Sequence, residues 1–366
     1  MVSLDEWMKD YNCSDSLDDY PQLSLDLSQW KTIDFEKVIQ KVEENWGHER
    51  NRFSTALCHY KIVDNEIYRK CYGEYTGFKM FVDSVMTSLA RKMVLPDMEF
   101  IHNLGDWPLQ KKTEENGVPI VSWCGSKSTM DIVLPTYELM ESVLKSMETI
   151  MLEMHTASGK THVPWEEKLN KAVFRGRDSN ELRLKIAKLA ISRPDLINGG
   201  ITRYFFFDKE KNPATVEHLS FHDFFKHRYV LSVDGTVSAY RFAFLLAGDS
   251  VILKSESDYY EHFYTQLKEN FHFLPFNGNN LVKVLEKVKT EDFRHIIKNA
   301  QQFVQENLQP FNLYCYHAKF LKEYAKKLIN TSKNVTNMEK VEKFDSNRQE
   351  NCNCPSDKNS RVHAEL

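Results

Sequence analysis

Short apolar runs of strand length alternate along this chain with longer stretches whose apolar residues recur at helical spacing. Ala172, Val173 and Phe174 form one such run, and the apolar residues over 180–192 that follow it lie on one helix face. This alternation predicts parallel sheets with helices on both faces, and therefore the α/β class. The expected strands are 60–68, 98–102, 118–123, 172–175, 202–207, 229–233, 250–254 and 272–276. The expected helices are 35–46, 76–93, 137–154, 180–192, 221–227, 239–246, 258–267, 281–288, 291–307 and 312–329.

The same pattern divides the chain into four parts. Two α/β blocks meet near Pro164 and Trp165, and the final helix is expected to pack back on the first block. Residues 1–33 look irregular. The last segment is polar, holds few large apolar side chains and is expected to be disordered. The predicted parts are 1–163, 164–307, 308–330 and 331–366.

The stretch from Lys171 to Arg183 has the chemistry of an anion site. A buried strand ends there, Gly176 permits a sharp turn, and Ser179 or Asn180 can cap the next helix. Unpaired N–H groups at a helix start attract anions, and guanidinium groups suit phosphate oxygens. The alternative is an ordinary strand–helix unit whose arginines are merely solvated. The three arginines are Arg175, Arg177 and Arg183.

A second glycine turn, over residues 234–241, repeats this arrangement. Gly235, Thr236 and Ser238 lie between an expected strand and an expected helix, and Arg241 follows. Because ligands bind beyond the carboxyl ends of parallel strands, two such turns can face one diphosphate. Two ordinary connections, with Ser238 as a helix cap, are the simpler alternative.

Asp106 is the candidate for proton transfer. It follows an expected strand in the first block, so its carboxylate can remove a hydroxyl proton across an interdomain cleft from the arginines. Asp is also a favoured turn residue, and Asp106 stands just before Trp107-Pro108. Either role explains the residue type.

Other clusters predict no metal site. Glu256-Ser257-Asp258 imitates a metal-binding acidic triplet, but Asp258 directly precedes an expected helix and is a better helix cap. His218 and His222 are four residues apart, yet no third ligand follows at a convincing spacing.

The composition indicates an ordinary two-domain globular protein. A net charge of −4 gives no nucleic-acid footprint, and no apolar run is long enough to span a bilayer. The C-terminal residues His-Ala-Glu-Leu look like a degenerate retention signal, and sequons occur at Asn12, Asn330 and Asn334. These features predict the endoplasmic reticulum lumen. No signal peptide is visible, which implies a fragment, a processed form or a variant of a longer product. Cys13 and Cys315 can clamp the two ends together.

Several of these motifs together resemble one family, the Rumi-type protein O-glucosyltransferases, and most closely its KDEL-containing subgroup. The resemblance covers roughly residues 50 to 330, and no motif within it is unique by itself. The matching motifs are Leu95-Pro96-Asp97-Met98-Glu99, Asp106-Trp107-Pro108, Phe174-Arg175-Gly176, Arg183, Ser238-Ala239-Tyr240-Arg241-Phe242 and the segment 259–268.

The resemblance implies two Rossmann-like domains around a central cleft, a glycosyltransferase-B-like arrangement. It implies inverting transfer of glucose from UDP-glucose, or xylose from UDP-xylose in some members, to serine in folded EGF-like repeats of Notch-type receptors. No metal or other cofactor is required. The first domain would then serve the acceptor and the second the UDP-sugar, and the tail would bind a retention receptor.

The same resemblance assigns roles to individual residues. Asp106 would be the catalytic base, and Arg183 would bind the diphosphate. The residues expected around the nucleotide are Thr236, Val237, Ser238, Ala239 and Tyr240, and Arg177 and Arg241 would be further donors to the UDP-sugar. Candidates for supporting roles are Arg175, Gly176, Ser126 and Lys127.

Some features depart from the family. A serine is common where Arg177 stands, and fewer cysteines surround Cys71 than in the family's first member. Residues 140–163 lack that member's proline- and glycine-rich stretch. The immunoglobulin-like domain that usually precedes this region is not seen. Two alternatives stay open: a xylosyltransferase acting on glycan, and an inactive lumenal binding or chaperone-like protein of the same fold.

Overall fold

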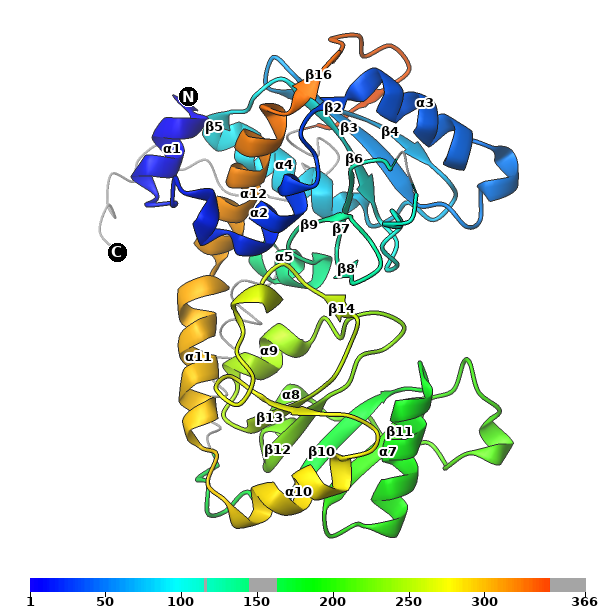
Figure 1. Ribbon diagram of the computed structural model, residues 1–366, viewed down its shortest axis with the longest axis vertical. Coiled ribbons are helices and arrows are strands. Elements are labelled where there is room, and N and C mark those ends of the chain that lie inside the picture. Colours follow the sequence, from blue (N-terminus) through cyan, green and yellow to red (C-terminus); the bar gives the residue numbers. More distant parts are fainter. Residues whose placement is uncertain (115–116, 145–162, 343–366) are drawn as a thin grey trace, which may run out of the picture.

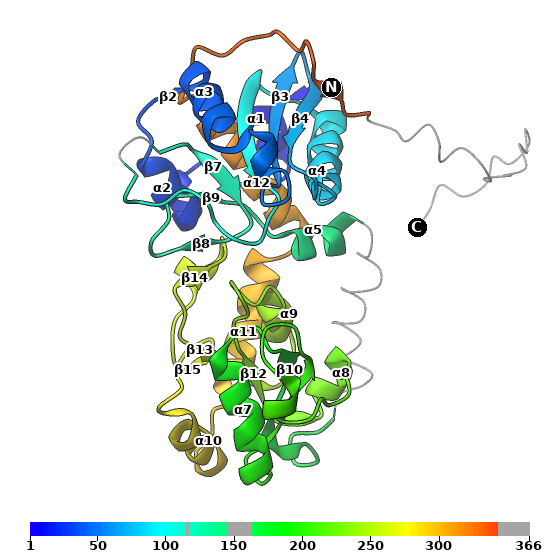
Figure 2. The same cartoon turned by 90° about the vertical axis from the view of Figure 1, so that its right-hand side faces the viewer.

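The computed structural model describes residues 1–114, 117–144 and 163–342. The described chain forms two lobes, each built around its own sheet, and the two views in Figures 1 and 2 show one lobe stacked above the other. This arrangement confirms the predicted α/β class. None of the helices within the described ranges is long and apolar enough to cross a membrane.

The first lobe contains a six-stranded mixed sheet in the order β17-β4-β3-β6-β7-β9. The β3–β4 hairpin turns at Asp64 and Asn65, which both adopt positive φ, and β3 also runs antiparallel to β6. The remaining pairs β6–β7 and β7–β9 are parallel. The strands are β3 (Leu57–Val63), β4 (Glu66–Tyr72), β6 (Met98–Asn103), β7 (Ile120–Ser122), β9 (Ile132–Val133) and β17 (Glu339–Lys340).

Within the described ranges, six α-helices accompany this sheet. Amphipathic spacing predicted α3 correctly from Phe35 to Trp46, and α4 also matches its prediction apart from three residues at the start and one at the end. The helices are α1 (Leu4–Asp10), α2 (Pro21–Ser28), α3 (Phe35–Trp46), α4 (Lys79–Lys92), α5 (Tyr137–Leu144) and α12 (Pro310–Ala325). Two small parallel ladders join β1 (Val2–Ser3) to β5 (Met93–Val94) and β2 (Ile33–Asp34) to β16 (Leu328–Ile329).

The second lobe contains a five-stranded, all-parallel sheet in the order β11-β10-β12-β13-β15. Numbered along the chain this is the doubly wound order 2-1-3-4-5, which reverses direction between β10 and β12. Its strands are β10 (Leu169–Arg177), β11 (Ile197–Arg203), β12 (His227–Ser232), β13 (Val251–Ser255) and β15 (Leu274–Phe276). Its helices are α7 (Glu181–Ser192), α8 (Phe221–Phe224), α9 (Phe242–Ala247), α10 (Leu281–Thr290) and α11 (His295–Asn307).

Among the described residues, a pair of helices and a pair of short strands connect the lobes. The chain leaves the second lobe through α11 and enters the first as α12, whose Phe320 packs edge-on against Phe100. Within the first lobe a disulfide joins Cys13 to Cys315, which confirms the predicted link between the two ends. The short strands β14 (Tyr259–Tyr260) and β8 (Gly125–Ser126) pair across the interface between the lobes.

Several predicted elements were wrong, and the tertiary structure explains why. The predicted helix 258–267 is an extended segment followed by a 3₁₀ turn, because Tyr259 and Tyr260 pair with the other lobe and Glu261 is fully buried. Asp258 therefore caps no helix. The strand predicted at 202–207 lies at 197–203, where Gly200 packs under Val216.

The two ends of the chain also differ from the prediction. Residues 1–33 contain α1 and α2, whose buried faces were too short to stand out as periodic. Residues 331–342 belong to the fold, not to a flexible tail, because Glu339 and Lys340 extend the first sheet and Val341 is buried. The rest of the predicted tail, including Cys352, Cys354 and the retention-like tetrapeptide, lies outside the described residues.

Candidate active site

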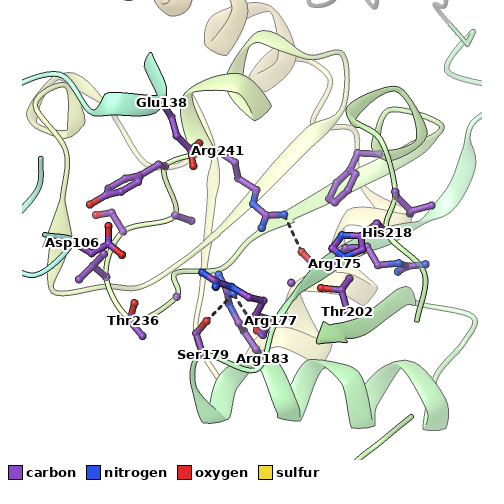
Figure 3. A pocket seen from close by; sticks show the side chains of 18 of the residues that line it. Asp106, Glu138, Arg175, Arg177, Ser179, Arg183, Thr202, His218, Thr236 and Arg241 are labelled. Atoms are coloured by element: carbon purple, nitrogen blue, oxygen red, sulfur yellow. Dashed lines mark hydrogen bonds between the residues drawn. The ribbon is translucent and has the colours of Figure 1, made fainter. Parts of the chain in front are cut away.

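A cavity of about 320 Å³ lies between the two lobes. The first lobe contributes Asp106 and the start of α5, and the second contributes the ends of β10 and β12 with the turns that follow them. Figure 3 shows the labelled side chains around this space. The lining residues are Asp106, Tyr137, Glu138, Arg175, Gly176, Arg177, Ser179, Arg183, Thr202, His218, Leu219, Phe224, Gly235, Thr236, Val237, Ser238, Ala239, Tyr240 and Arg241.

The cavity lies where the order of the second sheet reverses. Strands β10 and β12 are neighbours there, and both direct their carboxyl ends toward the first lobe. At such a point the two connections diverge to opposite faces of the sheet and leave a crevice for a ligand. The two glycine turns predicted from the sequence therefore come together at one opening.

Arg183 forms the floor of the cavity and ties the two turns together. Its Nε donates to the carbonyl of Asp234 at 2.9 Å, its Nη2 to that of Val233 at 2.8 Å, and its Nη1 to that of Arg177 at 3.1 Å. The guanidinium is buried, which together with the nearby charge of Arg241 lowers the pKa of Arg183 to about 9. Most of its donors thus support the backbone that surrounds the cavity.

The other three arginines of the cavity differ in their hydrogen bonds and in their exposure. Arg241 donates to the carbonyl of Arg175 at 2.9 Å, and burial lowers the pKa of Arg241 although Glu138 opposes this. Arg175 bonds the carbonyls of Phe174, Asn198 and Glu217. Arg177 is exposed, lies 5.5 Å above the ring of Phe205, and is the arginine whose guanidinium is most open to a ligand.

Side chains of the second lobe hold the turn over 234–240 in place. Lys254 pairs with the carboxylate of Asp234 at 2.8 Å, and the same carboxylate oxygen accepts the N–H of Ala239. Asn180 Nδ2 donates to the carbonyls of Asp234 and Gly235, while its Oδ1 caps α7 as predicted. A side chain at Gly235 would meet Arg183 Nη2 at 3.3 Å, so the turn approaches the guanidinium closely because it lacks a Cβ.

Asp106 reaches the cavity from the loop that follows β6. Asn103 fixes this loop, since its Oδ1 accepts the N–H of Gly105 at 3.0 Å and its Nδ2 donates to the carbonyl of Trp107 at 2.7 Å. Surrounding protein raises the pKa of Asp106, and Arg177 across the cavity opposes this rise. Asp106 is an exposed residue and lines the cavity. A carboxylate that is partly desolvated yet accessible is suited to accept a proton.

The pattern described as glycosyl transferase family 90 matches residues 9–363, almost the whole chain. The chain belongs to glycosyl transferase family 90. It is 41% identical to protein O-glucosyltransferase 2 of Danio rerio over 92% of the chain, and 42% identical to protein O-glucosyltransferase 3 of Homo sapiens over 88%.

The sequence is also similar to more distant relatives. Protein O-glucosyltransferase 1 of Homo sapiens is 27% identical over 76% of the chain and 74% of its own length. The chain spans 67% of the Danio rerio relative and 64% of the human protein O-glucosyltransferase 3. These relatives agree with the predicted resemblance to Rumi-type enzymes.

Within this family 90 member, the structure collects most of the predicted site residues and leaves out two. Asp106, the four arginines, Gly176 and residues 236–240 all line the cavity, and their roles stay predictions. Ser126 is buried in β8, and Lys127 forms an exposed ion pair with Asp258 at 2.9 Å, so both lie outside the cavity lining. The three sequon asparagines, Asn12, Asn330 and Asn334, are all exposed.

Sequence reasoning missed several cavity residues. Tyr137 and Glu138 were assigned only to a helix, and their helical pattern gave no sign that the start of α5 faces the second lobe. Thr202, Leu219 and Phe224 have ordinary surroundings in the sequence. His218 drew attention only as a possible metal ligand, and no group of three or more metal-binding side chains occurs among residues 1–114, 117–144 and 163–342.

Proposed function

We propose that this chain transfers glucose from UDP-glucose to a serine hydroxyl of folded EGF-like repeats, with inversion at the anomeric carbon. The observation that carries the proposal is the single cavity lined by Asp106 from one lobe and by two glycine turns with their arginines from the other. Membership of family 90, with protein O-glucosyltransferases among the relatives, supports this reaction class.

The charges around the cavity suit a sugar nucleotide. Arg177 is accessible for the diphosphate, and Arg183 and Arg241 add positive charge from the floor. Buried guanidinium groups in a partly enclosed site interact strongly with phosphate oxygens. The donor site is proposed to work with these cations alone, without a metal ion.

The proposed reaction is a direct displacement. The carboxylate of Asp106 accepts the proton of the serine hydroxyl while the serine oxygen forms a bond to the anomeric carbon. The bond from that carbon to the β-phosphate oxygen breaks on the opposite face, and UDP leaves with the electron pair. The arginines stabilise the negative charge that grows on the β-phosphate, so their interaction is strongest in the transition state.

The compartment is proposed to be the endoplasmic reticulum lumen. Two disulfides, Cys13–Cys315 and Cys58–Cys71, support an oxidising environment. The exposed sequons are compatible with glycosylation there. The C-terminal tetrapeptide is proposed to bind a retention receptor.

Mass spectrometry of a folded EGF-like repeat, incubated with the chain and UDP-glucose, tests the proposal. One added hexose is expected, with no loss of rate in the presence of a chelator. The Asp106→Asn variant is the control, and the anomeric configuration of the product tests inversion. Addition of a pentose only, from UDP-xylose to a glycan acceptor, would favour the xylosyltransferase. Binding of the repeat without transfer would favour the inactive binding protein.

A further inference from the structure

A second carboxylate shares the cavity with Asp106. Glu138 stands in the first turn of α5, is half-buried, and lines the same space. Figure 3 shows its side chain beside Arg241, on the same side of the cavity as Asp106. A direct displacement requires one proton acceptor, so the reaction proposed above leaves Glu138 without a role.

Asp106 and Glu138 both line the cavity, and both influence the phenol group of Tyr137. Burial raises the pKa of Tyr137, and the negative charges of Asp106 and Glu138 raise it further. The ring of Tyr137 meets that of Tyr240 edge-on at 5.4 Å, so aromatic surface lies beside the two acids. Carboxylates next to aromatic rings are suited to bind a sugar. Carboxylates accept hydrogen bonds from its hydroxyl groups, and aromatic rings pack against its C–H faces.

A carboxylate is out of place in a cavity meant only for a diphosphate, since it repels the phosphate charges. Glu138 also favours the charged form of Arg241, so this carboxylate lies near a cation of the cavity. Asp106 faces the open cavity and has a raised pKa. The two acids therefore suit different tasks, with Glu138 accepting hydrogen bonds and Asp106 accepting a proton.

We propose that Glu138 binds the sugar of the donor by accepting hydrogen bonds from its hydroxyl groups. This inference rests on the proposed function, because it assumes a sugar nucleotide in the cavity. It makes Glu138 a residue that selects for the sugar, whereas the arginines select for the diphosphate.

Calorimetry can separate this role from transfer itself, since binding needs no acceptor. The ligands are UDP, UDP-glucose and the four UDP-glucose analogues that each lack one hydroxyl, and the proteins are the full chain and its Glu138→Gln and Glu138→Ala variants. Both variants are expected to bind UDP-glucose about tenfold or more weakly, as for loss of a charge-assisted hydrogen bond, and to bind UDP at least as well as the wild type because a negative charge has been removed. Glu181→Gln, which removes the same charge from an exposed position on α7, is the matched control.

The analogues give a result that a merely structural role would not produce. Removal of the hydroxyl that Glu138 contacts should weaken binding to the wild-type chain but cause little further loss in Glu138→Gln. Equal losses in both proteins for every analogue would overturn the proposal. A parallel fall in UDP affinity would also overturn it, because Glu138 would then act through Arg241. If the wild-type chain binds UDP-glucose but transfers no sugar, the proposed transfer fails while the role of Glu138 can still be decided.

Discussion

Arg177 and Asp106 come from different lobes, and the guanidinium of Arg177 lowers the pKa of the Asp106 carboxyl group that burial raises. The two residues are 71 positions apart in the sequence, and only the stacking of the lobes brings them to one cavity. Burial thus makes the Asp106 carboxylate a better proton acceptor, and Arg177 limits this effect.

Replacement of Asp106 by Asn should lower kcat by about 10²-fold or more, the usual scale for loss of a general base. The pH profile of the wild-type rate should rise as Asp106 loses its proton, so its acid limb should lie above the ordinary aspartate pKa. The variant should lose this limb. Unchanged transfer by Asp106→Asn, measured with an EGF-like repeat, would remove Asp106 from the mechanism.

The same substitution should not reduce stability at neutral pH. A carboxyl group whose pKa is raised by folding is less favourable in its ionised form in the folded state, so above that pKa it destabilises the protein. Asn removes this cost. We expect an unchanged or higher Tm at pH 7 by scanning calorimetry, and a fall of several degrees would indicate a structural role for Asp106.

Replacement of Arg177 by Ala should have two effects, because this exposed side chain acts on both ligand and base. UDP affinity should fall by about tenfold, as for one charge-assisted hydrogen bond. The acid limb of the rate should move to higher pH, because a positive charge that lowers the pKa of Asp106 has been removed.

Arg203→Ala is the matched control for this experiment. Arg203 is also exposed and lies 4.7 Å above the same Phe205 ring, but it is outside the cavity lining. Arg203→Ala should leave both the UDP affinity and the acid limb of the rate near the wild-type values. Equal effects of the two substitutions would mean that Arg177 acts only through the general field of the lobe.

Replacement of Arg183 should affect the fold as well as the ligand. Its guanidinium donates to the carbonyls of Val233 and Asp234; without it the buried Val233 carbonyl loses this donor, whereas Asn180 still donates to Asp234. Arg183→Ala should therefore lower the free energy of unfolding by about 1–3 kcal/mol and also weaken UDP binding. Arg183→Lys should recover little, because an ammonium group lacks the planar fork that reaches both turns. Calorimetry that finds unchanged UDP affinity would contradict a role at the donor site.

The second lobe could be predicted well because its determinants are local. Alternating apolar runs and glycine turns located β10, α7 and β12, and the rule for parallel sheets placed their ends together. The relation between the lobes depends on contacts that no local pattern records. Tyr259 and Tyr260 looked helical, yet they form β14 because Gly125 and Ser126 offer a strand edge. Glu138 was missed for the same reason, since its partners come from the other lobe.

The disulfide between Cys58 and Cys71 shows a further limit of sequence reasoning. These cysteines are cross-strand partners in the β3–β4 hairpin, which the sequence predicted only as a single extended segment. The pairing of Cys13 with Cys315 could be predicted, since both stand at the ends of the globular part. Once a turn at Asp64 and Asn65 is recognised, the hairpin register brings Cys58 opposite Cys71.

Glu99 holds the segment over 332–341 against the first sheet, and its replacement by Gln should release that segment. One carboxylate oxygen accepts the N–H of Ser332 at 2.8 Å, and the other accepts bonds from His59 Nε2 at 2.9 Å and Lys61 Nζ at 3.0 Å. Breaking a buried ionic cluster costs about 3–5 kcal/mol of unfolding free energy. Amide hydrogen exchange in β17 should become faster in Glu99→Gln. The control is Asp97→Asn, which breaks the exposed pair Asp97–Lys333 and should lower the free energy of unfolding by less than about 1 kcal/mol.

The pH dependence of this cluster has a definite sign. Burial alone would raise the pKa of Glu99, but the hydrogen bonds from His59, Ser332 and Lys61 outweigh it and lower that pKa. A carboxyl group whose pKa is lowered by folding stabilises the protein above its unfolded pKa, and this contribution is lost as pH falls through the folded value. Burial also lowers the pKa of His59, so stability should begin to fall below pH 6.5 as the unfolded state takes up protons. Glu99→Gln should remove the part of this acid-side loss that comes from Glu99, whereas the part that comes from His59 should remain.

Removal of the Cys13–Cys315 disulfide should destabilise the chain more than removal of Cys58–Cys71. The first closes a loop of 302 residues and the second one of 13, so the first restricts the unfolded chain more strongly. We expect Cys13→Ala with Cys315→Ala to lower the free energy of unfolding by about 2–5 kcal/mol. The hairpin pair should cost less, because β3 and β4 remain joined by their backbone ladder. Urea titration of the two double variants measures the difference, and a larger loss for the hairpin pair would show that native packing at Cys58 and Cys71 outweighs chain entropy.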